Sequence, residues 1–262
     1  METVIKVLDK PKLKNPVLIE GLPGIGNVGR IAAGYLVEEL KAKKFAELYS
    51  PHFLPFVLLH NNVTELLKNE FYYWKNPRGN DLVILVGDSQ AGDQSGVGHY
   101  EVVEKILAFA GELGVKQVFT LGGFATGSIE ETKEIEVLGA VNDSKLAARY
   151  KDAGVNFTDT ASRIGMIVGA TGLLVGMAKN KGMEGVCLMG ETTGFPILTD
   201  PRAAEKVLQA LVKMLGLKVN LSTLDQRSKE MEEFLKKIEK MQQKALKQLS
   251  VKEGKEQLSY IG

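Results

Sequence analysis

The sequence of 262 residues has few of the side chains that commonly carry catalysis or cross-links. Its one cysteine, Cys187, cannot form an internal disulfide, and the apolar run around it predicts a buried thiol in a reducing compartment. The three histidines, His52, His60 and His99, lack the spacing of zinc ligands. Neither a G-x-S-x-G elbow nor a G-K-[ST] motif occurs. We therefore expect no metal site, no activated serine or cysteine and no typical nucleotide triphosphate site.

An excess of charge of one sign is also lacking. The chain has 33 Lys and Arg residues against 32 Asp and Glu residues, a formal net charge of +1 at pH 7. Such a balance creates no global field that would attract nucleic acid or an anionic membrane surface. We therefore expect no nucleic-acid partner.

No apolar run is long enough to cross a bilayer, which takes about 20 residues in a helix. The most apolar segment, 164–178, contains four glycines and is bounded by Arg163 and Lys179. We interpret it as a buried strand, a turn and a packed helix, and we expect no membrane partner. Residues 1–10 alternate like a strand and do not resemble a secretion signal, so we expect a cytoplasmic protein.

What the sequence does contain is a strand, a glycine-rich loop and a helix at residues 16–40. A short apolar run leads into four glycines, and apolar residues then recur at helical spacing. Glycine accepts positive φ and allows close approach, and the unpaired N–H groups at the start of the helix offer an anion site. The four glycines are Gly21, Gly24, Gly26 and Gly29.

Residues 24–29 also fit G-x-G-x-x-G, the dinucleotide-binding fingerprint. That fingerprint requires an acidic residue at the end of the second strand, about 20 residues further on, to hold a ribose hydroxyl. Glu47 stands at roughly this distance, but within the apolar run 45–49 and not at its end. We therefore favour a structural turn over nicotinamide or flavin binding and expect no cofactor.

Strands alternate with helices along the chain, which predicts an α/β fold with a mainly parallel sheet flanked by helices. A polar excursion at 126–160 is interpreted as an insertion or a short hairpin with a helix. Asp200 and Pro201 predict a capped helix start, and Gly216 its end. We expect strands at 45–50, 56–60, 71–74, 81–86, 117–121 and 185–189, and helices at 99–113, 144–152 and 201–215.

Ligand crevices in such sheets form beyond the carboxyl ends of the strands. Carboxylates there could act as acid and base or hold a divalent cation, and Arg30 in the first loop could meet a phosphate. The residues expected at the strand ends are Glu20, Asp88, Gly122, Gly123 and Glu191.

From residue 221 the sequence changes character, because apolar residues recur at steps of three and four between Lys and Glu. This pattern predicts a helix at 221–250, about 40 Å long, that follows a domain at 1–220 and precedes a flexible tail at 251–262. The apolar seam suits either contact with another subunit or packing on the chain's own domain. For the first alternative we expect the oligomer contacts at Leu224, Met231, Leu235 and Ile238.

Five segments occur in the order found in the proteasome assembly chaperone family: GLPGIGNVGR, DLVILVGDSQ, VFTLGG, IGMIVGATGLLVGMA and VCLMGETTGFP. Over residues 17–224 the chain resembles this family, and within it an archaeal homologue of the second eukaryotic proteasome assembly chaperone. The resemblance implies an α/β fold similar to nucleoside phosphorylases, a homo-oligomer and no established catalysis. It also implies an adaptor that binds α subunits of the proteasome core particle, as an assembly chaperone or an ATP-independent activator.

The alternative function is a small-molecule enzyme of the nucleoside phosphorylase or nucleosidase type, with Glu191 or Asp88 as acid and base. Phosphorolysis requires clustered cations, and the loops offer only Arg30. We therefore favour the adaptor, in which the enzyme-like crevice has lost its use. The residues of this crevice would be Glu20, Gly24, Gly26, Gly29, Arg30, Asp88 and Glu191.

The C-terminal tail is similar to a terminal motif of proteasome activators, to which the family resemblance draws attention. Proteasome activators insert a terminal hydrophobic-tyrosine-any residue motif between α subunits. Here Tyr260 stands third from the end, and Ser259 occupies the place of the hydrophobic residue. We expect α-subunit contacts by Leu258, Tyr260, Ile261 and Gly262, with a frayed tail as the alternative.

Overall fold

The computed structural model describes residues 2–92, 96–125, 134–193, 199–224 and 226. Its strands are β1 Val4–Val7, β2 Val17–Gly21, β3 Lys43–Tyr49, β4 Val57–His60, β5 Val63–Leu66, β6 Asn69–Trp74, β7 Leu82–Gly87, β8 Gln117–Ala125, β9 Val137–Val141 and β10 Glu184–Thr192. Its α-helices are α1 Val28–Glu39, α2 Val97–Glu112, α3 Ser144–Arg149, α4 Thr160–Arg163, α5 Ala170–Asn180 and α6 Pro201–Leu215, with 3-10 turns η1 Ile25–Asn27 and η2 Lys151–Ala153.

Eight of these strands form one sheet in the order β1-β3-β6-β7-β2-β8-β10-β9. Strands β7, β2, β8 and β10 are parallel. Antiparallel strands extend this parallel centre on both sides, β6, β3 and β1 on one and β9 on the other. The sheet is therefore mixed, because short connections such as residues 75–81 between β6 and β7 cannot hold the crossover that a parallel pair requires.

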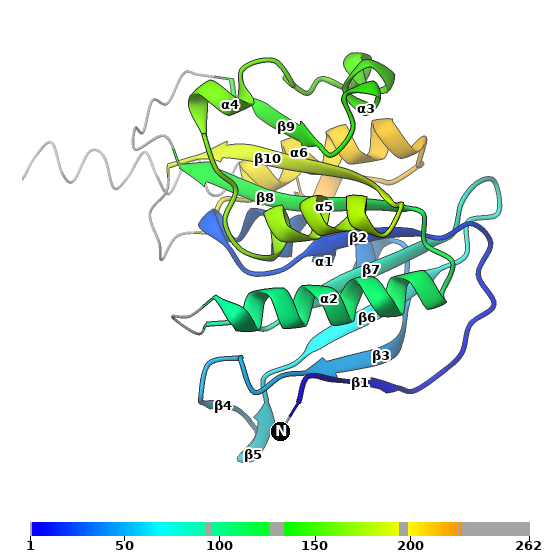
Figure 1. The fold of residues 1–262 in the computed structure, drawn as a ribbon, viewed down its shortest axis with the longest axis vertical. Coiled ribbons are helices and arrows are strands. Elements are labelled where there is room, and N and C mark those ends of the chain that lie inside the picture. The colour runs from blue at the N-terminus through cyan, green and yellow to red at the C-terminus, as the bar shows by residue number, and fades with distance from the viewer. Residues whose placement is uncertain (1, 93–95, 126–133, 194–198, 225, 227–262) are drawn as a thin grey trace, which may run out of the picture.

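Helices cover both faces of the sheet (Figure 1). Helices α1 and α6 pack on one face, and α2 and α5 pack on the other. Successive residues of β2 alternate between these two cores, with Val17 and Ile19 on the α1 side and Leu18 on the α2 side. Because both faces are buried, the central strands read as unbroken apolar runs.

Helix α1 lies directly against the sheet, and two glycines of the loop make this possible. A Cβ atom on Gly29 would lie 2.0 Å from the carbonyl oxygen of Leu121, and one on Gly21 would lie 2.2 Å from the carbonyl oxygen of Gly29. No side chain fits in such a gap. Close packing of helix on strand therefore accounts for both glycines without a ligand.

The segment 164–178 lacks the buried strand predicted for it. Helix α4 ends at Arg163, and the side chains of Met166 and Val168 are 75% and 77% exposed. The packed helix predicted after it is present as α5. The strand prediction is wrong because a short apolar run carries no sign of whether it is buried or lines a surface.

Strands β8 and β10 are longer than predicted, so Gly122, Gly123 and Glu191 lie within strands and not beyond their ends. The polar excursion contributes β9 to the main sheet, where it pairs with β10. The helix predicted in the excursion is present as α3. The capping of α6 is confirmed, because the Asp200 carboxylate accepts the N–H of Arg202 at 3.2 Å.

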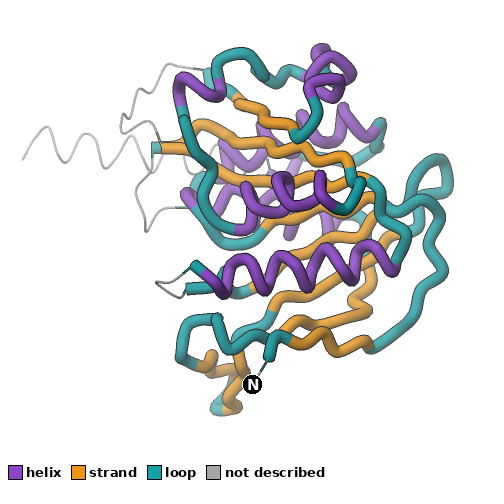
Figure 2. The backbone as a smooth tube through the Cα atoms, in the orientation of Figure 1, coloured by secondary structure: helices purple, strands orange, loops and turns teal. Residues whose placement is uncertain are grey.

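A separate hairpin, β4–β5, projects from the β1–β3 end of the molecule (Figure 2). Its turn consists of Asn61 and Asn62, with φ of 50° and 66°. Positive φ at both central residues suits a two-residue hairpin turn, and asparagine adopts it readily. Local turn chemistry thus fixes this hairpin.

Candidate functional site

A crevice of about 650 Å³ opens at the carboxyl ends of β2 and β8. From β2 the chain passes through α1 to β3, which lies on the β7 side of β2 in the sheet. From β7 it passes through α2 to β8, which lies on the opposite side of β2. Ligands bind at such switch points in open α/β sheets. The crevice is lined by Leu22, Pro23, Gly24, Ile25, Gly29, Gln90, His99, Leu121, Gly122, Gly123, Phe124, Ala125, Arg163, Ile164, Met166, Ile167, Val168, Gly169, Thr171 and Met189.

Most of these side chains are apolar, and the cationic one is engaged by the protein itself. The Arg163 guanidinium forms an ion pair with Glu136 and lies 5.4 Å from the centre of the Phe124 ring. Both contacts hold the positive charge at the wall of the crevice. The crevice therefore has the character of an apolar recess and not of a phosphate pocket.

Gln90 ties the two walls together, and the sequence reasoning missed it. Its side-chain amide donates to the carbonyl oxygen of Pro23 at 2.6 Å, and its amide oxygen accepts the N–H of Ala170 at 2.8 Å. The glycine loop and the start of α5 are thus joined through one side chain. Its place in the polar loop after β7 is the only sequence signal that could have drawn attention to it.

Glu20 is buried in β2 and does not line the crevice. One carboxyl oxygen accepts the N–H of Leu22 at 2.9 Å, and the other has no hydrogen-bond partner. Burial raises the pKa of Glu20 to about 8, with the Leu22 hydrogen bond acting in the opposite direction. The carboxyl is therefore mostly protonated at pH 7.

Cys187 is fully buried, as predicted. Desolvation raises the pKa of its thiol to about 12. A thiol that stays protonated at neutral pH is a poor nucleophile, so this residue acts as a small core side chain.

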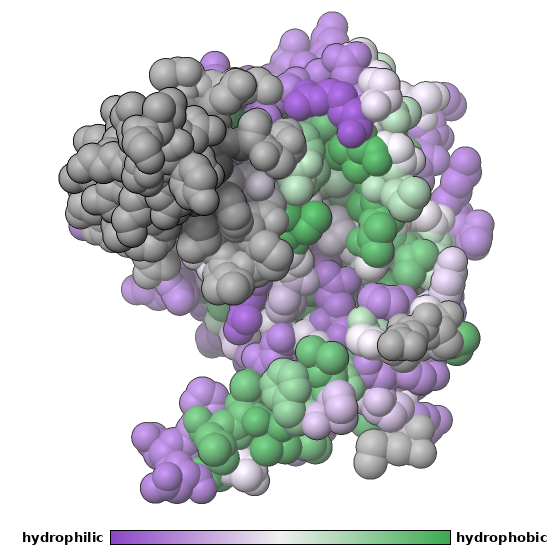
Figure 3. Space-filling view, turned by 90° about the vertical axis from the view of Figure 1, so that its left-hand side faces the viewer, coloured by the Kyte–Doolittle hydropathy of each residue, from purple (hydrophilic) through white to green (hydrophobic). Residues whose placement is uncertain are grey.

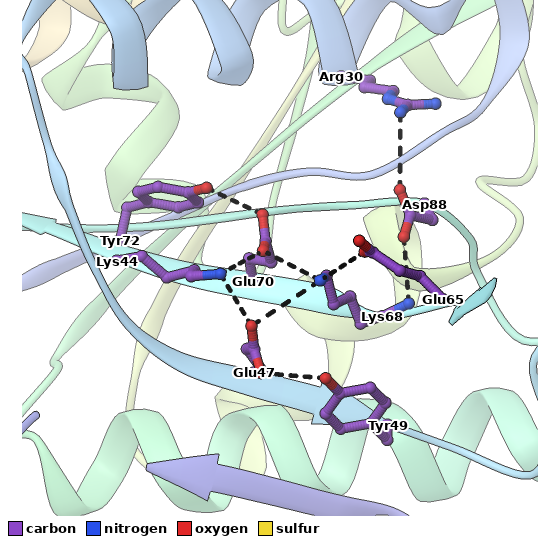
Figure 4. A network of polar contacts seen from close by, with 9 residues as sticks. All are labelled: Arg30, Lys44, Glu47, Tyr49, Glu65, Lys68, Glu70, Tyr72 and Asp88. Atoms are coloured by element: carbon purple, nitrogen blue, oxygen red, sulfur yellow. Dashed lines mark hydrogen bonds and ion pairs between the residues drawn. The ribbon is translucent and has the colours of Figure 1, made fainter. Parts of the chain in front are cut away.

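Arg30 and Asp88 lie outside the crevice lining and face each other at 3.8 Å (Figure 4). The Asp88 carboxylate also accepts the backbone N–H of Lys68 at 3.2 Å. Lys68 and Lys44 lie in the same region, among the carboxylates of Glu47, Glu65 and Glu70. Asp88 and Arg30, proposed as an acid and as a phosphate partner, therefore face each other outside the crevice.

Glu47 does not stand where a dinucleotide would need it. It lies on β3, which β6 and β7 separate from β2 and the glycine loop. Its carboxylate accepts hydrogen bonds from Lys44 at 2.8 Å and Tyr49 at 3.0 Å, and the Lys44 contact lowers its pKa. The order of the strands thus explains why the fingerprint has no ribose partner.

The residues predicted for the crevice therefore separate into two groups. Gly24 and Gly29 line it, whereas Glu20, Gly26, Arg30, Asp88 and Glu191 do not. Gly26 has φ of +61°, and its carbonyl oxygen accepts the N–H of Asp200 at 2.8 Å, so it serves the packing of the loop. Glu191 is 9% exposed, and its N–H donates to the carbonyl oxygen of Glu136.

Two further observations concern the described part of the chain alone. It holds no group of three or more His, Cys, Asp or Glu side chains that could bind a metal ion. It also has no helix that combines the length and the apolar character needed to span a membrane.

A family model matches residues 18–239, which is most of the chain, and its description is the PAC2 family. The chain belongs to the PAC2 family. Its fold matches PbaB of Pyrococcus furiosus, described as an archaeal proteasome activator, with 46% identity, a TM-score of 0.85 and coverage of 91% of this chain and 99% of that one.

Two further proteins are similar to this chain over nearly its full length. PbaA of Pyrococcus furiosus, described as an archaeal homologue of proteasome-assembly chaperone, is 26% identical with a TM-score of 0.71, over 98% of this chain and 99% of that one. A protein of Methanocaldococcus jannaschii is 41% identical over 259 residues, 98% of this chain and 96% of its own.

In this PAC2 chain the predicted oligomer residue Leu224 is fully buried in the chain's own core, with the α1 and α6 side chains. Nearby, the hydroxyl of Tyr35 donates to the carbonyl oxygen of Asn220 at 2.8 Å. The prediction of a subunit contact at Leu224 is therefore wrong, since packing within the chain continues past residue 220. The other residues predicted for oligomer and tail, Met231, Leu235, Ile238, Leu258, Tyr260, Ile261 and Gly262, lie outside the described residues.

Proposed function

We propose that this chain is a proteasome-interacting adaptor that binds α subunits of the core particle and has no catalysis of its own. The observation that carries the proposal is the match to PbaB, an archaeal proteasome activator, at 46% identity over nearly the full length of both chains. The likeness to PbaA, a homologue of proteasome-assembly chaperone, points to the same partner. Activation is the preferred mode, because PbaB is the more similar of the two. The lack of a G-K-[ST] motif favours activation without ATP.

The contacts around the crevice favour this adaptor over an enzyme of the nucleoside phosphorylase type. Phosphorolysis needs cations that are free to meet phosphate. Arg163 is held by Glu136 and the Phe124 ring, and Arg30 pairs with Asp88 outside the crevice. The crevice is in this view a feature of the fold that carries no reaction.

The adaptor works as a cytoplasmic homo-oligomer. The helix expected at 221–250 contributes Met231, Leu235 and Ile238 to the contacts between subunits, and each subunit presents its tail to the α subunits. Leu258, Tyr260, Ile261 and Gly262 make the contact. Several tails on one oligomer raise the effective concentration of a weak contact.

Peptidase assays of an archaeal core particle test this proposal. Without nucleotide, the full chain should raise the rate of cleavage of a fluorogenic peptide several-fold. Removing residues 259–262 should abolish most of this increase, and Tyr260→Ala should reproduce most of the loss because each copy then binds more weakly.

The matched control is Gln257→Ala, which changes the same tail next to the proposed contact residues and should leave the increase intact. The adaptor proposal would be refuted if the full chain neither changed the rate of peptide cleavage by the core particle nor co-sedimented with it. Stimulation that survives both tail variants would move the contact to the globular part of the chain.

A further inference from the structure

One face of the β4–β5 hairpin presents apolar side chains to solvent. Val57 pairs with Leu66 across the hairpin and Leu59 pairs with Thr64, which places these four side chains on one face. Val57, Leu59 and Leu66 are 45%, 70% and 63% exposed. No charged side chain belongs to this face.

The opposite face holds the hairpin on the body of the protein. Leu58 packs against the α2-side core, and its cross-strand neighbour Glu65 forms an ion pair with Lys68 at 3.2 Å. Leu58 therefore anchors the base of the hairpin, whereas Val63 near the turn is 62% exposed on the same face. The face with Leu59 and Leu66 points away from this anchor.

A groove of about 660 Å³ adjoins the outward face. Phe53, Leu54, Phe56 and the start of β1 contribute to its walls, together with the hairpin residues Val57 and Leu66. Glu2 is the one charged residue among those that line it. Figure 3 shows apolar side chains gathered over this lower end of the molecule, where the hairpin projects.

We infer that this surface, the hairpin face with its groove, is a contact between two copies of the chain. The inference rests on the proposed homo-oligomer and adds a second surface to the contacts proposed for the helix expected at 221–250. Each copy would place the outer part of its hairpin, with Leu59, in the groove of the other.

Three features favour a second copy as the occupant. A two-stranded hairpin is marginal by itself and gains stability when its apolar face is covered. A two-fold contact places like residues opposite each other, so a neutral face avoids the repulsion that a charged one would create. The surface also carries both a projection and a recess, which a reciprocal contact fills at once.

Light scattering coupled to size exclusion tests the inference on the full chain. The double variant Leu59→Glu with Leu66→Glu should reduce the molar mass at least two-fold, because it buries four carboxylates in each two-fold contact. The circular dichroism spectrum should stay unchanged, since both positions are exposed in the single chain. Leu59→Ala removes a side chain that is 70% exposed in the single chain, so it leaves folding intact and should raise the dissociation constant about tenfold.

Met166→Glu with Val168→Glu is the matched control, since it adds the same charge at equally exposed apolar positions beside the crevice and should leave the mass unchanged. A monomeric wild type, or a Leu59 and Leu66 variant of unchanged mass, would overturn the inference. The peptidase assay on the same samples separates the two proposals. If wild type does not stimulate peptide cleavage but the hairpin variant has a lower molar mass, only the adaptor proposal is refuted. If the hairpin variant loses stimulation at an unchanged molar mass, the surface is assigned to contact with the core particle.

Discussion

The crevice and the β4–β5 hairpin both expose apolar side chains, but they do so for different reasons. The crevice lies where the strands of a parallel centre end, and Gln90 joins its walls. The hairpin stands outside the main sheet. On its outer face Leu59 and Leu66 are 70% and 63% exposed, so packing within the described chain does not explain why they are apolar. Apolar surface at the crevice follows from the fold, whereas at the hairpin it points to a partner.

The two regions also differ in how tightly their backbones are held. At the crevice, α1 lies against β2 and β8 through Gly21 and Gly29, so that even one added carbon atom meets backbone. At the hairpin, the contacts with the body are made by side chains, such as Leu58 against the core and Glu65 with Lys68, and these can adjust to a change. Changes at the crevice should therefore affect stability, and changes at the hairpin should affect association.

The largest effect on stability is expected from Gly29→Val. Its Cβ would lie 2.0 Å from the carbonyl oxygen of Leu121, so helix and sheet must separate. Overpacking of this kind should lower the free energy of unfolding by more than about 3 kcal/mol, measured by urea denaturation.

Gly34→Ala in the same helix is the control, because a Cβ there meets no atom within 4 Å. It should raise stability by up to about 1 kcal/mol through helix propensity. Equal behaviour of the two variants would show that α1 is not packed as closely as described.

A smaller effect, dependent on pH, is expected from Glu20→Gln. The carboxyl has a pKa of about 8 in the folded protein against an ordinary 4.5. Between these values the folded chain keeps a proton that the unfolded chain has lost, so wild-type stability falls as pH rises from about 5 to 8 and then levels off. Glutamine stays neutral at every pH. At pH 8.5 the free energy of unfolding of the variant should therefore exceed that of wild type by roughly a few kcal/mol.

Denaturation of both proteins at pH 5 and pH 8.5 checks this expectation. The advantage of the variant should be small at pH 5, where the wild-type carboxyl is protonated in the folded state. Parallel pH profiles would mean that Glu20 gains a partner that keeps its charge.

The smallest of the three effects is expected from Gln90→Ala. The variant loses both hydrogen bonds that join the crevice walls, at Pro23 and Ala170. The free energy of unfolding should fall by about 1 to 2 kcal/mol. His60→Ala, at an exposed position of the hairpin, should change it by less than about 0.5 kcal/mol. A larger loss at the hairpin than at Gln90 would reverse the comparison of the two regions.

Much of the fold could be predicted from local patterns, and less of the candidate site. The strand, loop and helix at 16–40 follow from an apolar run, glycines and helical spacing. Of the acidic groups expected at the strand ends, Glu20 and Glu191 lie within strands, and Asp88 pairs with Arg30. Which charged groups meet depends on strand order and on the direction of each side chain, and neither is written in the spacing of one segment.

The sequence by itself determined the local structure of this protein: the glycine loop, the caps of α6, the buried Cys187 and the resemblance that placed it in its family. These features depend on residues that are close in the chain, such as Asp200 beside Pro201. Only the tertiary structure decided that β9 joins the main sheet, that Leu224 enters the core and that the hairpin turns an apolar face outward. The physical reason is that burial and pairing are properties of segments brought together from distant parts of the chain, so the same apolar run can fill a core, line a crevice or await a partner.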